Sequence, residues 1–221
     1  LKSLAEKGYL QEVEDGGFVL TSRGRDEARR LITDVRQAMA SVDPLPPRDS
    51  QRLVELLDRL VQNCLNTPPP PDTWSIRLSY KLMPSLSPPL PFIEQAVSCL
   101  EAYRDDSHLA AWRGSSLTAT SLEALTLIWR GEANSLNSLI EKLEWRGHSP
   151  DIYRDAIHHL KSRGLINGPM EALQLTLEGK KLRDEIEEKT DRYFYAPWVC
   201  LNAAEANEMK ELLVHLRDGL K

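Results

Sequence analysis

The stretch LKSRGLINGPMEALQLTLEG, residues 160–179, contains the signals that decide the fold. A helix is expected to end at Gly164, because glycine suits the left-handed position just past a helix C-terminus. A short apolar strand follows, and the turn Asn167-Gly168-Pro169 leads into a second strand over Leu173–Leu175. Thr176 is then placed to cap a long helix. The stretch therefore predicts a helix, a β-hairpin and a long helix in that order.

An earlier stretch shows the same pattern. Residues 4–10 align with residues 160–166 at an offset of 156, and residues 20–24 (Leu-Thr-Ser-Arg-Gly) align with residues 175–179 (Leu-Thr-Leu-Glu-Gly) at an offset of 155. Between its strands this copy carries Asp15-Gly16, a strong signal for a two-residue hairpin turn. The long helices are expected over Ser22–Met39 and Leu177–Arg192. Two explanations are open: an internal duplication, or a chance likeness between generic amphipathic helices.

A helix-turn-helix pattern precedes the hairpin in the second copy alone. A helix over Ser121–Arg130 leads by Gly131 into a helix over Ser135–Trp145, and helices joined by a short glycine turn form a helix-turn-helix. Ser149-Pro150 supplies an N-cap followed by proline at the first helical position. The recognition helix is therefore expected over Pro150–Arg163.

The first copy begins inside the corresponding helix, because residues 1–7 align with residues 157–163. We expect either a fragment of a longer product or a unit that has lost its front half. Together the two copies predict a mainly α fold with small β-hairpin wings. The arrangement expected is tandem winged-helix (helix-turn-helix) units, of which the first is truncated at its N-terminus.

A stripe of large apolar residues follows each copy, again at an offset of 156. Its members are Leu53, Leu56, Leu57 and Leu60 in the first copy, and Met209, Leu212, Leu213 and Leu216 in the second. The spacing i, i+3, i+4, i+7 places these side chains on one face of a helix. We expect the two helices to pack together as a pseudo-dimer within the chain, or to join two chains as a homodimer.

Proline divides the chain, since 11 of the 14 prolines lie between Pro44 and Pro91. The run Pro68–Pro71 fits neither a helix nor a central strand and is typical of an extended spacer. The sequence therefore predicts a partial winged helix with a C-terminal dimerisation-type helix over residues 1–63, a proline-rich linker over 64–91, and a helical region with the second winged helix and a terminal amphipathic helix over 92–221.

Composition excludes several classes of protein. Net charge is −5, from 28 cations and 33 anions, so there is no overall attraction to nucleic acid and any such binding needs a local patch. No apolar run approaches the roughly 18 residues of a membrane span, and no signal peptide is seen, so a cytoplasmic protein without membrane contact is expected. The three cysteines form no CxxC pair and are expected to be buried thiols. Known enzyme and cofactor motifs are missing, so no enzyme and no cofactor are predicted.

Three segments of the first copy resemble the MarR-type winged-helix transcription regulators. They are residues 6–10 (Glu-Lys-Gly-Tyr-Leu), residues 20–24, and residues 43–49 (Asp-Pro-Leu-Pro-Pro-Arg-Asp) ahead of the leucine stripe. The resemblance implies DNA binding and dimerisation through terminal helices. Residues 106–111, 146–149 and 190–198 resemble a bacterial helical family with a winged-helix end, which implies no known chemistry.

The recognition helix is expected to bury one face, made of Ile152, Tyr153, Ala156, Ile157 and Leu160. The opposite face holds three candidate DNA-binding residues, Arg154, His158 and Lys161. Ser149, at the free N-terminus of the helix, is the fourth and is expected to hold a phosphate. Two carboxylates share that face, so the alternative is a solvated surface with local ion pairs. His158 and His159 are adjacent and point about 100° apart on a helix, so no metal site is predicted.

Aromatic residues mark two candidate ligand-binding regions, with Tyr103, His108 and Trp112 in one and Tyr195 and Trp198 in the other. The alternatives are structural. Asp106 or Ser107 can cap a helix that starts at His108, and residues 193–198 can form a packed corner at the end of the long helix. The acidic run from Glu185 to Asp191 is expected to be a solvated face.

The function hypothesis is a DNA-binding transcription regulator of winged-helix type. It would bind double-stranded DNA, respond to a small-molecule effector, and hold its two units as a pseudo-dimer. The alternative hypothesis is a winged-helix scaffold that binds a small molecule or a protein partner without binding DNA. An acidic first hairpin and a recognition face of mixed charge favour this alternative.

Overall fold

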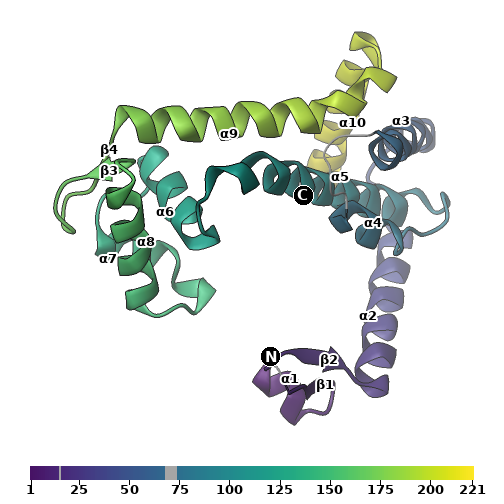
Figure 1. The fold of residues 1–221 in the computed structure, drawn as a ribbon. Coiled ribbons are helices and arrows are strands. Elements are labelled where there is room, and N and C mark those ends of the chain that lie inside the picture. The colour runs from purple at the N-terminus through teal and green to yellow at the C-terminus, as the bar shows by residue number, and fades with distance from the viewer. Residues whose placement is uncertain (15, 68–73) are drawn as a thin grey trace. The chain divides into compact units, whose positions relative to one another are not determined.

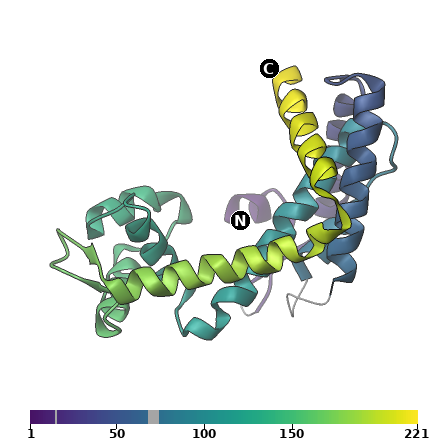
Figure 2. The same cartoon turned by 90° about the horizontal axis from the view of Figure 1, so that it is seen from above.

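The computed structural model describes residues 1–14, 16–67 and 74–221, which form two compact units (Figures 1 and 2). The first unit comprises residues 1–61, 80–98 and 201–221, and the second comprises residues 62–79 and 99–200. Neither unit is a single continuous segment. Within the described residues, no helix combines the length and the apolar character needed to cross a membrane.

The division into units differs from the predicted boundaries at residues 63 and 92. Helices α3 (Pro47–Asn66) and α5 (Pro89–Trp112) each contribute to both units. The predicted linker contains the end of α3, the whole of α4 (Trp74–Tyr80) and the start of α5, so much of it is helix. The predicted spacer Pro68–Pro71 lies outside the described residues.

The first unit begins with a hairpin and a long helix. Its elements are α1 (Lys2–Glu6), β1 (Leu10–Glu12), β2 (Phe18–Leu20) and α2 (Ser22–Ala40). The strands pair antiparallel with Leu10 opposite Leu20 and Glu12 opposite Phe18. Five residues, 13–17, therefore separate the strands. The predicted turn Asp15-Gly16 includes Asp15, which lies outside the described residues.

The apolar stripes of α3 and α10 (Ala203–Gly219) form much of the core of the first unit. All four leucines of the α3 stripe have no exposed surface, and Met209, Leu212 and Leu216 are also buried. Arg52 of α3 donates to Glu208 of α10 from Nε at 3.0 Å and from Nη2 at 2.9 Å. Arg59 reaches Glu205 at 2.5 Å. The two helices thus carry complementary charges along their contact.

The second unit contains the helix-turn-helix. Its elements are α4, η1 (Arg113–Ser115), α6 (Ala119–Trp129), α7 (Leu136–Lys142), η2 (Glu144–Arg146), α8 (Pro150–Ser162), β3 (Ile166–Asn167), β4 (Gln174–Leu175), α9 (Leu177–Tyr195) and η3 (Ala196–Cys200), with parts of α3 and α5. One apolar core joins α6, α7, α8, the hairpin and α9, and includes Leu125, Leu139, Ile157 and Ile186. Figure 2 shows α9 as one long helix that starts beside α6 and the hairpin.

The joint between hairpin and long helix is built by the same hydrogen bonds in each unit. In the second unit, the Thr176 hydroxyl donates to Gly164 O at 2.7 Å and accepts from Gly179 N at 3.0 Å. In the first unit, the Thr21 hydroxyl donates to Gly8 O at 2.7 Å and accepts from Gly24 N at 3.0 Å. Both threonines are N-caps, as predicted. No disulfide joins the cysteines: Cys64 and Cys99 are buried thiols and Cys200 is half-buried.

Candidate nucleic-acid interface

Two short helices, α6 and α7, position the candidate recognition helix α8. Helix α6 is capped by Thr118 and ends before Gly131, whose φ of +71° suits glycine. Helix α7 is capped by Ser135 through a capping box with Ser138. The predicted helix Ser135–Trp145 is divided into α7 and the 3₁₀ turn η2. Helix α8 then packs against both α6 and α7.

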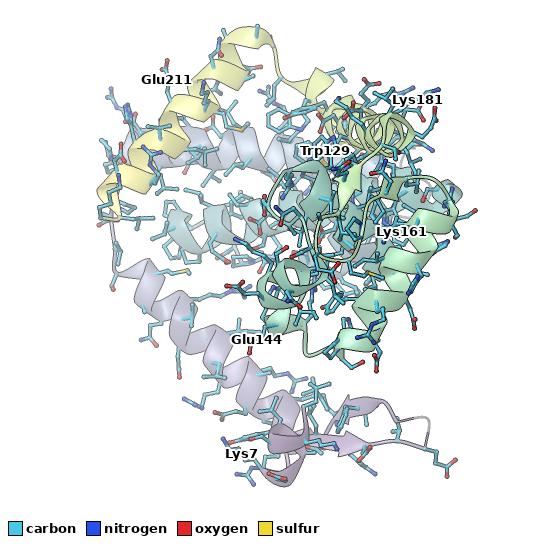
Figure 3. All side chains as sticks on the ribbon, turned by 90° about the vertical axis from the view of Figure 1, so that its left-hand side faces the viewer. Lys7, Trp129, Glu144, Lys161, Lys181 and Glu211 are labelled. Carbon is cyan, nitrogen blue, oxygen red and sulfur yellow. The ribbon has the colours of Figure 1, made fainter. Side chains whose placement is uncertain are left out.

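Helix α8 is amphipathic, and its buried face was largely predicted. Tyr153, Ala156, Ile157 and Leu160 are buried. Ile152 is 40 % exposed, so its predicted burial is wrong. The outer face points into solvent, with Arg154 and His158 exposed and Lys161 half-buried. Figure 3 shows Lys161 on the outer side of α8.

The N-terminus of α8 is open. Ser149 stands at the N-cap position, is exposed, and makes no side-chain capping bond, while Pro150 occupies the first turn. Unpaired amides at a helix N-terminus attract phosphate oxygens. Asp151 lies in the same turn and pairs with Arg154. Among the described residues, Ser149, His158 and Lys161 therefore have no charged partner, whereas Arg154 pairs with the neighbouring Asp151.

Two backbone hydrogen bonds join the hairpin region of the second unit to the helix-turn-helix. Leu136 N donates to Met170 O at 2.8 Å, and Leu173 N donates to Asn134 O at 2.7 Å. Glu171 is the one charged residue between the two strands, over residues 168–173. The loop between these strands therefore offers no cation for a phosphate contact.

A pocket of about 980 Å³ opens in the same unit and is lined by side chains from α5, α6, η2 and α9. His108 and Trp112, two of the predicted ligand-binding residues, line it, together with Arg183, Glu187 and Arg146. The lining carries both charges, so the pocket suits a polar ligand with an ionic group.

Arg183 is the most unusual side chain of this pocket. It is 2 % exposed, donates from Nε to Thr126 Oγ1 at 2.9 Å, and pairs with Glu187. Its Cζ lies 4.9 Å from the ring centre of Trp129, which Figure 3 shows between α6 and α9. Nη1 is buried and has no hydrogen-bond partner. An unpaired donor on a buried cation is costly, so a donor without a partner among the described residues marks Arg183 as a candidate contact for a polar or anionic ligand group.

Burial and the Arg183 guanidinium together set the electrostatics of the pocket. Burial, and next the Arg183 guanidinium, lower the pKa of His108, whose Nδ1 lies 3.1 Å from Thr190 Oγ1. Burial acts to raise the pKa of Glu187, but the hydrogen bond from Arg183 and the nearby cations outweigh it and lower that pKa. Glu187 therefore lies partly buried against the pocket and is not on the solvated face predicted for the acidic run.

The remaining predicted ligand-binding residues lie elsewhere. Tyr103 has no exposed surface. Its ring centre lies 6.3 Å from that of Phe194, and its hydroxyl donates to Tyr193 O at 3.4 Å. The ring centres of Tyr195 and Trp198 lie 5.5 Å apart, in the predicted corner after α9. The five residues thus form two separate groups. Asp106 starts no helix at His108: within α5, its carboxylate accepts from Ser75 N at 3.0 Å and from Ile76 N at 3.1 Å, at the start of α4.

Arg183 was missed by sequence reasoning. It lies in a helix rich in charged residues, and its partners Thr126 and Trp129 are more than 50 residues away on α6. The only local signal was its place on the same face as Gly179 and Ile186, which are both buried.

Comparison with known proteins agrees with this geometry. The model of a helix-turn-helix family matches residues 82–220, well over half of the chain, and the protein belongs to that helix-turn-helix family. No curated protein and no solved structure matches the chain. Helix-turn-helix domains place their second helix in the major groove of DNA. The family therefore indicates a DNA-binding regulator and points away from an enzyme.

Proposed function

We propose that this protein is a transcription regulator of winged-helix type that reads DNA with α8 and responds to a small molecule bound beside Arg183. The observation that supports this proposal most directly is the accessibility of the outer face of α8. Helices α6 and α7 hold α8 in place, and no described residue of the unit covers that face. Ser149 at the open helix end and Lys161 are positioned for phosphate, and Arg154 and His158 for base edges.

The 980 Å³ pocket supports the response to an effector. Arg183 and Glu187 come from α9, Thr126 comes from α6, and α6 packs directly against α8. A ligand that engages Nη1 of Arg183 would shift the balance of these contacts. Because α6 supports α8, such a shift reaches the DNA-reading helix through two packed elements.

A pseudo-dimer built within one chain is the third part of the proposal. The apolar stripes of α3 and α10 are buried in the core of the first unit. Arg52 and Glu208, which form an ion pair between these helices, are 156 residues apart in the sequence, and this equals the offset between the two aligned stripes. The joint of the first unit repeats that of the second bond for bond, which favours duplication over chance likeness.

The test is binding to random-sequence duplex DNA across a salt series. We expect a steep fall of log affinity with log salt, because phosphate contacts displace counterions. Arg154→Ala with Lys161→Ala should reduce the slope by about one to two, and helix content should stay unchanged in circular dichroism. Arg48→Ala with Lys210→Ala removes the same net charge from the first unit and serves as the matched control. Equal slopes for both double variants would refute the assignment of α8.

A second function is favoured by one observation. Arg154 is paired with Asp151, and residues 168–173 carry no cation. A winged-helix scaffold that binds a small molecule or protein without DNA would have this charge pattern. Absence of duplex binding even at low salt would support the scaffold and direct the search to ligands of the pocket.

A further inference from the structure

The ring of His108 offers a hydrogen-bond acceptor to the pocket. The Thr190 hydroxyl donates its hydrogen to Ile186 O at 2.7 Å, so the 3.1 Å contact between Thr190 Oγ1 and His108 Nδ1 must take its hydrogen from the ring. Burial lowers the pKa of His108, which leaves the ring neutral at pH 7. Nε2 of this tautomer carries a lone pair and has no hydrogen-bond partner among the described residues. Because His108 lines the pocket, Nε2 is available to a ligand.

Arg183 offers a donor close to that acceptor. Residues 183, 187 and 190 follow the spacing i, i+4, i+7 and therefore share one face of α9. Nε and Nη2 of Arg183 are taken by Thr126 and Glu187, which leaves Nη1 buried and unpaired. After burial, the charge of Arg183 is the strongest influence on the pKa of His108. A donor on a cation and a neutral acceptor thus lie near each other in one pocket.

The charges of the pocket lining balance. Among the described lining residues, five are Arg or Lys and five are Asp or Glu. Around His108 the signs are mixed as well, because Arg183 and Arg104 act to lower its pKa while Glu187 and Asp105 act to raise it. The unpaired donor of Arg183 favours an anionic acceptor, since hydrogen bonds between charged groups are the stronger ones. In a lining without net charge, such an anion is best accompanied by a cation on the same ligand.

An apolar wall adjoins these polar groups. Trp112 follows His108 by about one turn of α5 and lies on the same side of that helix. Leu127 follows Thr126, the residue that holds Arg183. Both Trp112 and Leu127 line the pocket and are half-buried, so they retain apolar surface that a ligand can cover.

We propose, as an inference that rests on the proposed effector function, that the ligand of this pocket is an α-amino acid with a large apolar side chain. Its carboxylate accepts from Arg183 Nη1, and its ammonium group donates to His108 Nε2 beside Asp105. Its side chain packs against Trp112 and Leu127. An apolar anion would leave His108 Nε2 without a donor, and an apolar amine would leave Arg183 Nη1 unpaired.

Titrations of the 221-residue chain with three matched probes, followed by NMR, test this proposal. The probes are L-phenylalanine, 3-phenylpropanoate, which lacks the ammonium group, and 2-phenylethylamine, which lacks the carboxylate. We expect L-phenylalanine to bind about tenfold or more tightly than either of the other two, because each of them leaves one polar group of the pocket unpaired. Equal affinity of L-phenylalanine and 3-phenylpropanoate would overturn the proposal. So would the absence of binding by L-phenylalanine, L-leucine and L-tryptophan at about 10 mM.

Variants locate the site. Arg183→Met should abolish the preference for L-phenylalanine over 2-phenylethylamine. Lys181→Met removes the same charge from an exposed position of α9 outside the pocket lining, and should leave that preference unchanged (Figure 3). Equal preference in the two variants would overturn the role of Arg183.

His108→Asn keeps the test decisive if Arg183→Met lowers the helix content. Asparagine retains a donor for Thr190 and removes Nε2. L-phenylalanine should then bind no more tightly than 3-phenylpropanoate. A retained preference of about tenfold would overturn the assignment of Nε2.

Duplex binding separates this proposal from the proposed function, because the probe titrations contain no DNA. Amino-acid binding by a chain that binds no duplex would support the ligand class and refute the regulator. Duplex binding without amino-acid binding would overturn the ligand class and leave the regulator in place.

Discussion

Gly179→Ala is expected to destabilise the second unit selectively. A Cβ at this position would lie 2.0 Å from Leu165 O and 3.0 Å from Leu175 Cδ1. The first contact is with backbone, which no rotamer change relieves, so the start of α9 must move away from the strand.

The magnitude follows from three contributions. Overpacking of this kind costs about 1–3 kcal/mol. The displacement also weakens two bonds to Leu165 O, from Thr176 Oγ1 at 3.0 Å and from Thr176 N at 3.1 Å, each worth about 1 kcal/mol. Alanine offsets at most about 1 kcal/mol through its higher helix propensity. The expected loss of unfolding free energy is therefore about 2–4 kcal/mol.

Tryptophan fluorescence during urea unfolding gives the assay, because all five tryptophans lie in the second unit. The midpoint should fall by about 1–2 M for Gly179→Ala. Gly24→Ala, whose Cβ would lie 2.0 Å from Tyr9 O, should leave this transition in place and reduce helix content in circular dichroism. Gly114→Ala meets no atom within 4 Å and is the control. A Gly179→Ala midpoint equal to that of Gly114→Ala would refute the reasoning.

Three further outcomes are expected. Leu160→Ala should lower the free energy of unfolding by about 2–5 kcal/mol, because the side chain is fully buried. Leu4→Ala, at the matching position of the first unit, should lower it by less than about 1 kcal/mol, because Leu4 is exposed. Chemical denaturation measures both changes. The pKa of His108 is lowered in the folded chain, so as the pH falls the unfolded chain takes up a proton first. The free energy of unfolding should therefore decrease as the pH drops below about 6.5. His108→Asn should remove that part of the pH dependence in melts followed by fluorescence. Arg52→Glu should lower the urea midpoint of the first unit slightly, since both partners are partly solvent-screened, and added Glu208→Arg should restore it in urea unfolding followed by circular dichroism; a double variant no more stable than the single one would contradict the pairing.

Local signals predicted much of the second unit. Thr176 caps α9 and Gly164 adopts a φ of +68°, because capping and left-handed turns depend on residues a few positions apart. Helix α8 ends at Ser162, one residue short of the prediction, and its spacing of apolar residues correctly marked Leu160 and Ile157 as core. Three of the side chains proposed to bind DNA, Arg154, His158 and Lys161, were also chosen from this spacing, and Ser149 was chosen from its N-cap position.

Other features depended on contacts that no local pattern encodes. Ile152 fits the apolar face of α8 by its helical angle, yet it lies at the edge of that face, where no neighbouring element covers it. Asp106 seemed placed to start a helix, but α5 continues through it and its carboxylate reaches Ser75 and Ile76 on α4. Such roles are set by partners about 30 residues away.

The sequence by itself determined the two hairpins, the long helices α2 and α9 and the threonine caps that join them, because these depend on interactions within a few residues and on periodicity. Only the tertiary structure decided that the units are discontinuous, that Arg183 is buried with an unpaired donor, and that Leu31 is exposed while its counterpart Ile186 is buried. The physical reason is that the burial of a residue depends on the elements that pack against it. Ile186 is core because α6 packs on α9, whereas Leu31 stays exposed because no described element covers it.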